Sequence, residues 1–144
     1  ADKIYLNSLN KSKILFDKKY FNEINFSTTF EIISILLIFH LKFSNEQDMN
    51  SKNKVNEELM KNLINDLDKS LRDVGISDMS IGKYVKKYVK KFYYRLKVLD
   101  LILENKNQLE FLDYLNSLKF IKKNNSNELA NELLEFFPAF KKNN

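Results

Sequence analysis

The stretch DVGISDMSIGKYVKKYVKKFYYRL, residues 73–96, contains both glycines of the 144-residue chain, Gly75 and Gly82. From about residue 54 to residue 74, up to the start of this stretch, apolar side chains recur every three or four positions. This spacing is typical of an amphipathic helix with one buried stripe. Gly75 then stands where the left-handed residue that ends a helix belongs. The sequence therefore predicts a helix that stops at Gly75.

A second helix is predicted after this glycine, from about residue 79 to residue 104. Three residues that favour the N-cap position lie at or next to its start, namely Ser77, Asp78 and Ser80. Gly82 falls in its first turn, where glycine costs about 1 kcal/mol relative to alanine. We expect the missing side chain to allow another backbone to approach closely. Together the two helices form a helical hairpin that turns at Gly75.

The composition of the whole chain favours an all-α fold. Apolar residues make up 44% of the 144 residues, and this length suits one buried core but not two typical domains. Two glycines and one proline leave too little turn chemistry for frequent β-hairpins. We predict a single domain, residues 1–144, folded as a compact bundle of about five to seven helices.

Other helices are predicted on both sides of the hairpin. Thr28 and Glu31 have the spacing of a capping box, so a helix should begin at about residue 28 and end at residue 42 or 43. It contains the most apolar run of the chain, Ile32–Leu41, whose ten residues fall short of the roughly 20 that span a bilayer. We interpret this run as the buried central helix. The remaining elements are one or two short helices in residues 4–20, a loop at 44–53, and helices at 107–122 and 127–137, the last closed by Pro138.

The residue types that most catalytic sites need are scarce. The chain has no cysteine, which excludes disulfides, thiolate metal sites and thiol nucleophiles. Its single histidine, His40, lies inside the apolar run, and we expect a core residue bonded to a polar group rather than a metal ligand or a base. No glycine-rich phosphate loop, paired histidine ligands or GxSxG segment occurs. We therefore predict a protein that is not an enzyme and holds no cofactor.

Six lysines line one side of the second hairpin helix. At 100° per residue they occupy an arc of about 140°, and apolar side chains fill the opposite side. From residue 79 to residue 99 there are seven basic residues and no acidic one, whereas the net charge of the whole chain is +5. Like charges at this spacing cost about 0.2–0.5 kcal/mol per pair. The lysines, which we predict to bind an anionic partner, are Lys83, Lys86, Lys87, Lys90, Lys91 and Lys97.

Three explanations of this concentrated charge remain open. Acidic residues of the preceding helix, Asp66, Asp68 and Asp73, can offset it if the two helices pack antiparallel. An external polyanion, either rRNA or an anionic membrane surface, can offset it from outside, and affinity for RNA would then depend strongly on salt. The lysines can also form a solvated face without a partner.

The only two arginines of the chain lie in or next to this stretch, and we predict that they join the two helices. Arg72 follows Asp68 by four residues, which places both on one face of the first helix. Arg95 lies at the border of the apolar side of the second helix, outside the lysine arc, where an arginine usually pairs with a carboxylate. We predict that Arg72, Arg95 and nearby acids such as Asp68 or Asp78 clamp the hairpin.

One segment, DLDKSLRDVGISDMSIGKYVKKYVKKFYYRLKVLD, residues 66–100, carries a long ordered pattern of mixed residue types. It resembles the ubiquinol-cytochrome c chaperone family, whose members are cytochrome b assembly factors of mitochondrial complex III and their α-proteobacterial relatives. The family pattern is approximately D-x-D-x-x-L-R-x-x-G-(V/I)-x-D-x-x-(V/I), several residues, K-x-(V/M)-K-K, then F-Y-G-R, with Tyr94 here in place of the last glycine. The matching residues are Asp66, Asp68, Leu71, Arg72, Gly75, Ile76, Asp78, Ile81, Lys83, Val85, Lys86, Lys87, Phe92, Tyr93 and Arg95.

The resemblance implies a non-enzymatic chaperone that binds newly synthesised cytochrome b during biogenesis of the cytochrome bc1 complex. It also implies a small partner chaperone and, in mitochondria, a place near the ribosomal tunnel exit. The first ten residues, ADKIYLNSLN, show the pattern of neither a signal peptide nor a transit peptide, so the expected location rests on the resemblance. That location is the matrix side of the mitochondrial inner membrane, or the bacterial cytoplasm near the inner membrane, for a soluble or peripheral protein. The structural motif consists of Asp68, Arg72, Gly75, Asp78, Phe92, Tyr93 and Arg95.

The residues alone leave a second interpretation of function open. The lysine face is also typical of a helical RNA-binding module, or of a structural subunit that meets an acidic neighbour in a larger complex. In the chaperone interpretation the same face contacts RNA or anionic lipid, while an apolar surface shields the hydrophobic client. DNA is not expected as a partner in either case.

Overall fold

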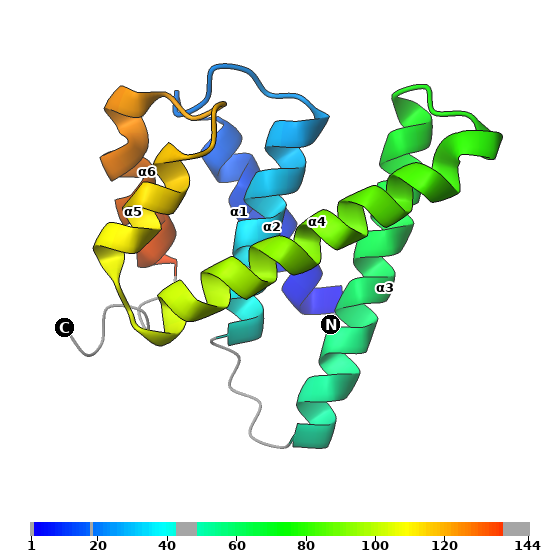
Figure 1. Ribbon diagram of the computed structural model, residues 1–144, viewed down its shortest axis with the longest axis horizontal. Coiled ribbons are helices and arrows are strands. Elements are labelled where there is room, and N and C mark those ends of the chain that lie inside the picture. Colours follow the sequence, from blue (N-terminus) through cyan, green and yellow to red (C-terminus); the bar gives the residue numbers. More distant parts are fainter. Residues whose placement is uncertain (1, 18, 43–48, 137–144) are drawn as a thin grey trace.

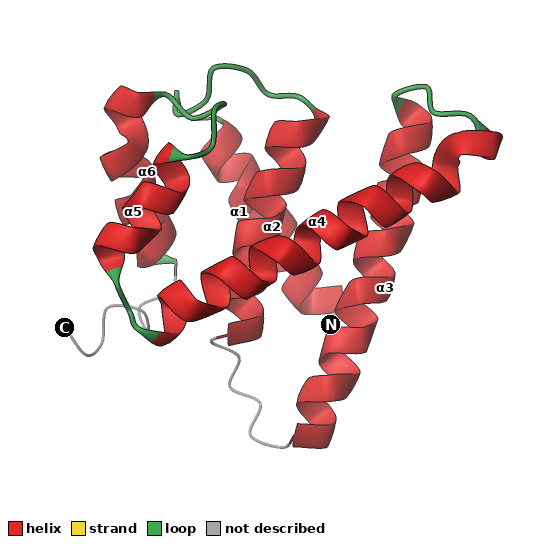
Figure 2. Cartoon of the chain, in the orientation of Figure 1, coloured by secondary structure: helices red, strands yellow, loops and turns green. Residues whose placement is uncertain are grey.

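The computed structural model describes residues 2–17, 19–42 and 49–136, and most of them belong to helices (Figures 1 and 2). The fold is all-α, as predicted, and the described residues form six α-helices, which lies within the predicted range. Within these ranges, no helix combines the length and the apolar character that crossing a membrane requires. In chain order the elements are α1 (Asp2–Phe16), α2 (Phe26–Lys42), α3 (Met49–Asp73), α4 (Asp78–Glu104), α5 (Gln108–Asn116), a 3₁₀ turn (Lys123–Asn125) and α6 (Ser126–Glu135).

α2 forms the centre of the core because it is apolar on all of its sides. Every residue from Ile32 to Phe39 is buried. A helix of this kind needs neighbours all around it, and both α1 and α4 pack directly against α2. α3 packs against α1 and α4, while α5 packs against α4 and α6 (Figure 1). The predicted buried central helix is therefore confirmed.

α2 begins earlier than the capping-box spacing predicts. The backbone N–H of Thr28 donates a hydrogen bond to Asn25 Oδ1 (3.0 Å), which makes Asn25 the N-cap and Phe26 the first helical residue. The Thr28 hydroxyl donates to the Glu23 carbonyl (3.0 Å), and Glu31 is buried in the core. The predicted capping box is wrong because Asn25, itself a strong cap residue, stands three positions before Thr28.

Two other helix boundaries differ from those predicted. α3 begins at Met49, inside the predicted loop 44–53, of which residues 44–48 lie outside the described residues. α5 ends at Asn116, six residues before the predicted end at 122. The predicted closure of the last helix by Pro138 also falls outside the described part of the chain.

The early end of α5 is explained by pairing between two connecting segments. Phe21, between α1 and α2, forms an isolated antiparallel bridge with Ile121, between α5 and α6. The N–H of Lys122 donates to the Tyr20 carbonyl (2.8 Å), and the N–H of Asn22 donates to the Phe120 carbonyl (2.7 Å). Backbone groups that pair across the two connections in this way are not available to continue α5. The pairing fixes α5 and α6 to the connection between α1 and α2.

The helical hairpin turns at Gly75, as predicted. Gly75 has a φ of 103°, a region that side-chain-bearing residues rarely adopt. The N–H of Ile76 donates to the Leu71 carbonyl (3.0 Å), and the N–H of Gly75 donates to the Arg72 carbonyl (3.0 Å). These two bonds are those of a Schellman motif, which satisfies carbonyls that the end of α3 would otherwise leave unpaired.

The two helices of the hairpin diverge from this turn instead of lying side by side over their whole length. α3 runs away from the turn along one edge of the molecule, whereas α4 crosses the molecule towards α5 (Figure 1). The predicted close approach of a backbone to Gly82 is wrong, because a Cβ built at Gly82 would meet no atom of the described residues within 4 Å. Gly82 therefore borders open space on the surface of α4.

Alanine substitutions at the two glycines should change stability in opposite directions. Gly75→Ala should lower the free energy of unfolding by about 1–2 kcal/mol, because alanine pays a steric cost at positive φ. Gly82→Ala should raise it by about 0.5–1 kcal/mol, because alanine is the better helix former and its methyl group meets nothing. Urea unfolding curves of both variants test this, and a change of the same sign at both positions would contradict the assigned conformations.

His40 lies at the C-terminal end of the apolar run of α2, where it is half-buried. The Nζ of Lys11 lies 3.3 Å from its Nε2. Burial, together with the charge of Lys11, lowers the pKa of His40 to about 4, so the ring is neutral at pH 7 and Nε2 accepts a hydrogen bond. The predicted bond of His40 to a polar group is confirmed, whereas its predicted place in the core is wrong, since the ring is only half-buried.

Candidate functional site

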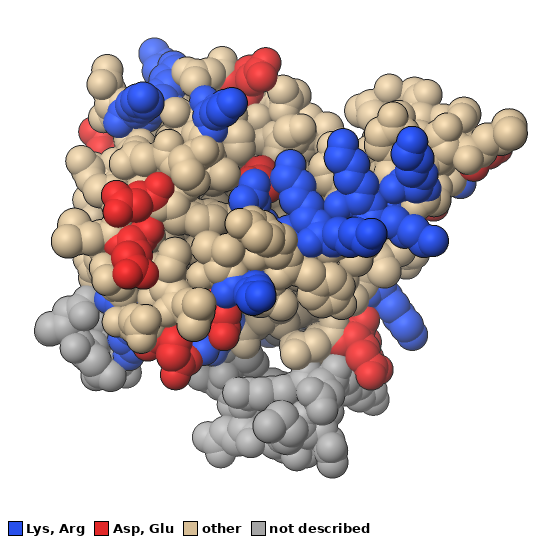
Figure 3. Space-filling view, viewed as in Figure 1, with Lys and Arg blue, Asp and Glu red and all other residues tan. Residues whose placement is uncertain are grey.

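An open groove of about 1060 Å³ runs along the outward side of α4. Five of the six predicted lysines line it, whereas Lys97 does not. The space-filling view shows blue side chains gathered over the half of α4 nearer to the hairpin turn (Figure 3). We call this surface the basic groove, and the residues that line it are Gly82, Lys83, Lys86, Lys87, Lys90, Lys91, Tyr94 and Arg95.

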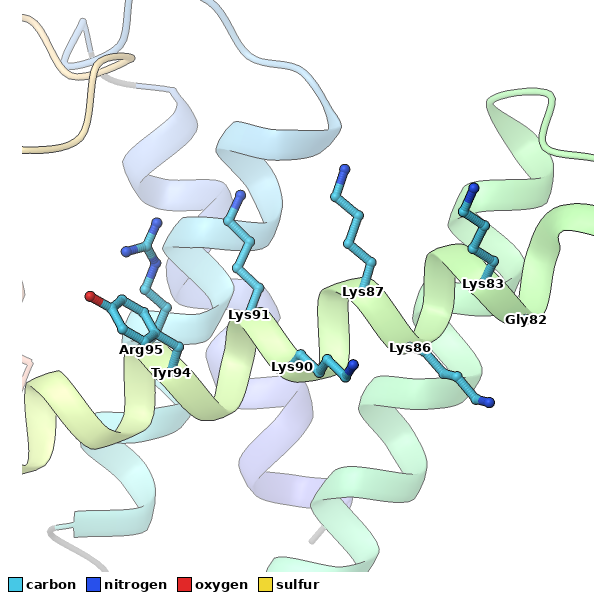
Figure 4. A pocket seen from close by; sticks show the side chains of 8 residues that line it. All are labelled: Gly82, Lys83, Lys86, Lys87, Lys90, Lys91, Tyr94 and Arg95. Atoms are coloured by element: carbon cyan, nitrogen blue, oxygen red, sulfur yellow. The ribbon is translucent and has the colours of Figure 1, made fainter.

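The side chains of the basic groove stand in two rows on either side of it (Figure 4). Lys83, Lys87 and Lys91 point in one direction, and Arg95 continues their row. Lys86 points to the other side, and Lys90, four residues on, lies along the front of α4. Members of a row are four residues apart and therefore about 6 Å apart along the helix axis. Two adjacent rows of this kind enclose a furrow on the surface of a helix.

The groove lysines have no acidic partner in the part of the chain that the structure describes. None of them forms a salt bridge with a carboxylate of the described residues. Of the acids considered as compensation, Asp66 accepts a hydrogen bond from the Tyr5 hydroxyl (2.8 Å) and Asp68 accepts one from Arg72. Neither Asp66 nor Asp68 therefore pairs with a groove lysine, so the predicted compensation by the acids of α3 does not take the form of salt bridges to these lysines.

Aromatic rings at the start of α2 support the row that contains Lys87 and Lys91. Tyr88 of α4 makes edge contacts with Phe26 and Phe30, with ring centroids 4.9 and 5.0 Å apart. Lys91 Nζ lies 5.8 Å from the ring centroid of Tyr88 and 6.0 Å from that of Phe30, and Lys87 Nζ lies 6.0 Å from that of Tyr88. These contacts fix α4 to the start of α2 and orient two of the lysines. Helical periodicity in a single segment could not reveal them.

Arg72 links the two helices across the hairpin turn. Its Nε donates to Asp68 Oδ1 (2.5 Å) on α3, and its Nη1 donates to Asp78 Oδ1 at the start of α4. These hydrogen bonds, first to Asp68 and then to Asp78, raise the pKa of Arg72. All three side chains are exposed enough for water to weaken their attraction. The contacts are those predicted for the Arg72 half of the clamp.

Arg95 pairs with a different acid from those predicted. Its Nε donates to Glu31 Oε1 (3.1 Å), and its Nη2 lies 3.1 Å from Glu31 Oε2, so the guanidinium and the carboxylate face each other through two parallel contacts. Glu31 is only 4% exposed. The predicted pairing of Arg95 with Asp68 or Asp78 is wrong, because Arg95 faces α2 and not α3. Arg95 therefore connects α4 to the centre of the core.

Two more side chains surround the Glu31–Arg95 pair. The guanidinium carbon of Arg95 lies 5.8 Å from the ring centroid of Tyr94, which stands in the basic groove. Tyr114 of α5 is buried, which raises the pKa of its phenol, and the charge of Arg95 opposes that rise.

Glu31 is the residue of this site that sequence reasoning missed. The one available signal was an acid at the start of the most apolar run, and its spacing to Thr28 had suggested a cap.

Comparison with protein-family models places the whole hairpin and α2 in one known family. The model described as Ubiquinol-cytochrome C chaperone matches residues 21–112. The chain belongs to this chaperone family. The resemblance noted for residues 66–100 is therefore confirmed, and the family match extends over α2 and into α5. Comparisons with curated proteins and with solved structures return no match.

Residues 21–112, which we call the family segment, contain the main features of the site in this chaperone-family member. This segment includes the basic groove, the Arg72 link and the Glu31–Arg95 pair. Of its adjacent motif residues, Phe92 is buried and Tyr93 is 52% exposed. No group of three or more acidic or histidine side chains among the described residues is placed to hold a metal ion. The site is therefore a cationic surface on a rigidly attached helix.

Proposed function

We propose that this member of the ubiquinol-cytochrome C chaperone family is a non-enzymatic assembly chaperone for cytochrome b in biogenesis of the cytochrome bc1 complex. The observation that carries the proposal is the family match over residues 21–112, which includes α2, α3 and α4 complete. Newly synthesised cytochrome b is the client, and a small second chaperone assists. The protein acts peripherally at the inner membrane, on the matrix side in a mitochondrion or on the cytoplasmic side in a bacterium.

The lysine face of α4 is the surface that we assign to an anionic partner in this function. Three features of the structure support the assignment. The groove lysines have no carboxylate partner among the described residues, the turn at Gly75 and Arg72 fixes one end of α4, and Arg95 fixes its middle to Glu31. A charged surface on a rigid helix loses little conformational entropy when it docks. Lys97 lies on the same face beyond the groove and belongs to the proposed surface.

The experiment that tests the function is removal of the gene from the organism that encodes this chain. The bc1 complex should fall well below its normal level, while other respiratory complexes that contain no cytochrome b stay unchanged. Tagged full-length protein, captured from gently solubilised membranes, should enrich newly made cytochrome b. A normal bc1 level in the deletion strain would overturn the proposal.

The alternative function, a helical RNA-binding module or a structural subunit, is favoured by one observation, the absence of acidic partners for the groove lysines among the described residues. An RNA-binding module would show an RNA affinity that falls steeply with salt and that flattens when Lys86, Lys87, Lys90 and Lys91 are changed to glutamine. A structural subunit would migrate with an intact larger complex in the normal strain. In either case the deletion strain would keep its bc1 complex.

A further inference from the structure

We propose that the outward face of α4 is a docking surface for an acidic amphipathic helix of a partner protein. The inference rests on the proposed function in one respect, since it names the class of partner that the basic surface of the chaperone takes. The face consists of the basic groove and its continuation towards the C-terminal end of α4, as far as Leu101.

The outward face of α4 is cationic near the hairpin turn, and towards the other end it carries the exposed side chains of Tyr94 and Leu101 beside Lys97. At 100° per residue, Lys83, Lys90, Tyr94 and Leu101 fall within an arc of about 40°, so they share one line along the helix. This line is about 27 Å long at a rise of about 1.5 Å per residue. Tyr94 is 61% exposed and Leu101 is 63% exposed. A partner that matches the line must therefore offer negative charge at one end and apolar side chains at the other.

The groove has the shape that a helix can enter. Its two sides are adjacent rows at four-residue spacing, and the furrow between such rows is where a side-chain ridge of a second helix packs. The walls are made mainly of lysine methylene stems and the Tyr94 ring, with the ammonium groups at the rim. Gly82 leaves one end of the furrow open, since nothing among the described residues lies within 4 Å of a Cβ built there.

The charge pattern fits a short acidic helix. Glutamates or aspartates four residues apart on a helix repeat about every 6 Å, which is the repeat of Lys83, Lys87 and Lys91 on α4. Acidic side chains bound the surface at both ends of α4. Asp78 stands at the turn, and at the other end Asp100 and Glu104 accept hydrogen bonds from Lys42. The positive surface is thus limited to about four turns, a length suited to one helical segment.

The same observations disfavour the two other polyanions. Binding of single-stranded RNA uses successive exposed aromatic faces for base stacking, but Tyr94 is the one aromatic ring among the described residues that lines the groove, since Tyr88 is packed against Phe26 and Phe30. An exposed Leu101 has no role against a phosphate backbone. A flat anionic bilayer would bring Glu104 close to its negative head groups, because Glu104 lies within about 60° of the line and its side chain is 67% exposed. An acidic helix avoids this penalty because it covers only the line itself.

Binding of designed peptides to the full-length chain tests the inference. The probes are two fluorescent helical peptides of about 20 residues, or about 30 Å. Each carries glutamates along one face of one half and leucines along the same face of the other half, in the two possible chain directions. A peptide of identical composition and scrambled order is the control. We expect one ordered peptide to bind at least about tenfold more tightly than the scrambled one, as measured by fluorescence anisotropy.

Variants of exposed residues locate the bound peptide. Lys87→Gln with Lys90→Gln should weaken the ordered peptide about tenfold, and Leu101→Ser should weaken it roughly fivefold. The matched controls are Lys122→Gln with Lys123→Gln, which removes the same charge elsewhere, and Leu6→Ser, which removes an exposed leucine of α1. Neither control should change the affinity. Unchanged far-UV circular dichroism shows that each variant is folded.

Three results would overturn the inference. The first is equal binding of ordered and scrambled peptides. The second is tighter binding of a single-stranded RNA of about 20 nucleotides than of the peptides, lost with the groove lysines but not with Leu101→Ser. The third is binding to phosphatidylglycerol vesicles without peptide binding. All are distinguishable from failure of the proposed function, because that failure is a normal bc1 level in the deletion strain.

Discussion

Replacing Arg95 with methionine is expected to lower the free energy of unfolding by about 3–5 kcal/mol, because it leaves the carboxylate of Glu31 buried without its partner. Glu31 is 4% exposed, and the structure gives its two oxygens Arg95 as their hydrogen-bonded counterion. A buried charge without a partner is far more costly than a missing contact at the surface. Urea unfolding followed by far-UV circular dichroism measures the loss.

A double variant separates the unpaired charge from lost packing. Glu31→Leu combined with Arg95→Met removes both charges, and it should recover most of the stability that Arg95→Met loses, because an apolar pair can replace a buried ion pair at little cost. Arg72→Met is the matched control, since its partners are exposed and its loss should be much smaller. If Arg95→Met proves no more destabilising than Arg72→Met, the burial assigned to the Glu31–Arg95 pair is wrong.

Phe92→Ala should lower the free energy of unfolding by a similar amount, about 3–5 kcal/mol, because it empties a filled position of the core. Phe92 is 2% exposed and stands with Leu37 of α2 and Leu63 of α3, where three helices meet. Its neighbour Tyr93 is 52% exposed, so Tyr93→Ala should change stability by less than about 1 kcal/mol.

The contrast between these adjacent motif residues is the informative measurement. Thermal and urea unfolding of both variants should agree in rank, with Phe92→Ala far below Tyr93→Ala. Equal losses at the two positions would mean that α4 is rotated about its axis relative to the structure described. Such a rotation would also move the lysines of the basic groove away from solvent.

Local signals in the sequence were sufficient for the hairpin and for the class of fold. The turn at Gly75 was predictable because a Schellman motif depends on a few consecutive residues and on a positive φ that glycine tolerates. The Arg72 link was predictable for a similar reason, since Asp68 and Asp78 lie within six residues of it. The lysine arc followed from helical periodicity alone, because these side chains extend away from the core.

The contacts between distant segments could not be read from local patterns. Glu31 and Arg95 are 64 residues apart, and the carboxylate of Glu31 looked like part of a helix cap. Which acid Arg95 meets is decided by how α4 crosses α2, and this follows from packing of the whole core. The early start of α3 at Met49 was missed because its first two turns are polar and show no apolar period. Gly82 was misjudged because a glycine in a helix does not reveal whether a neighbour is near.

The bridge between Phe21 and Ile121 affects the order in which the protein completes its fold during synthesis. It joins positions 100 residues apart, and the core that contains Leu36 also contains Leu129, Leu133 and Leu134 of α6. Contacts so distant along the chain form late, since a long loop must close before they contribute. Residues 21–112 thus leave the ribosome before their last core neighbours in α6 have emerged. The nascent family segment exposes an unfinished apolar surface until residue 134 has emerged.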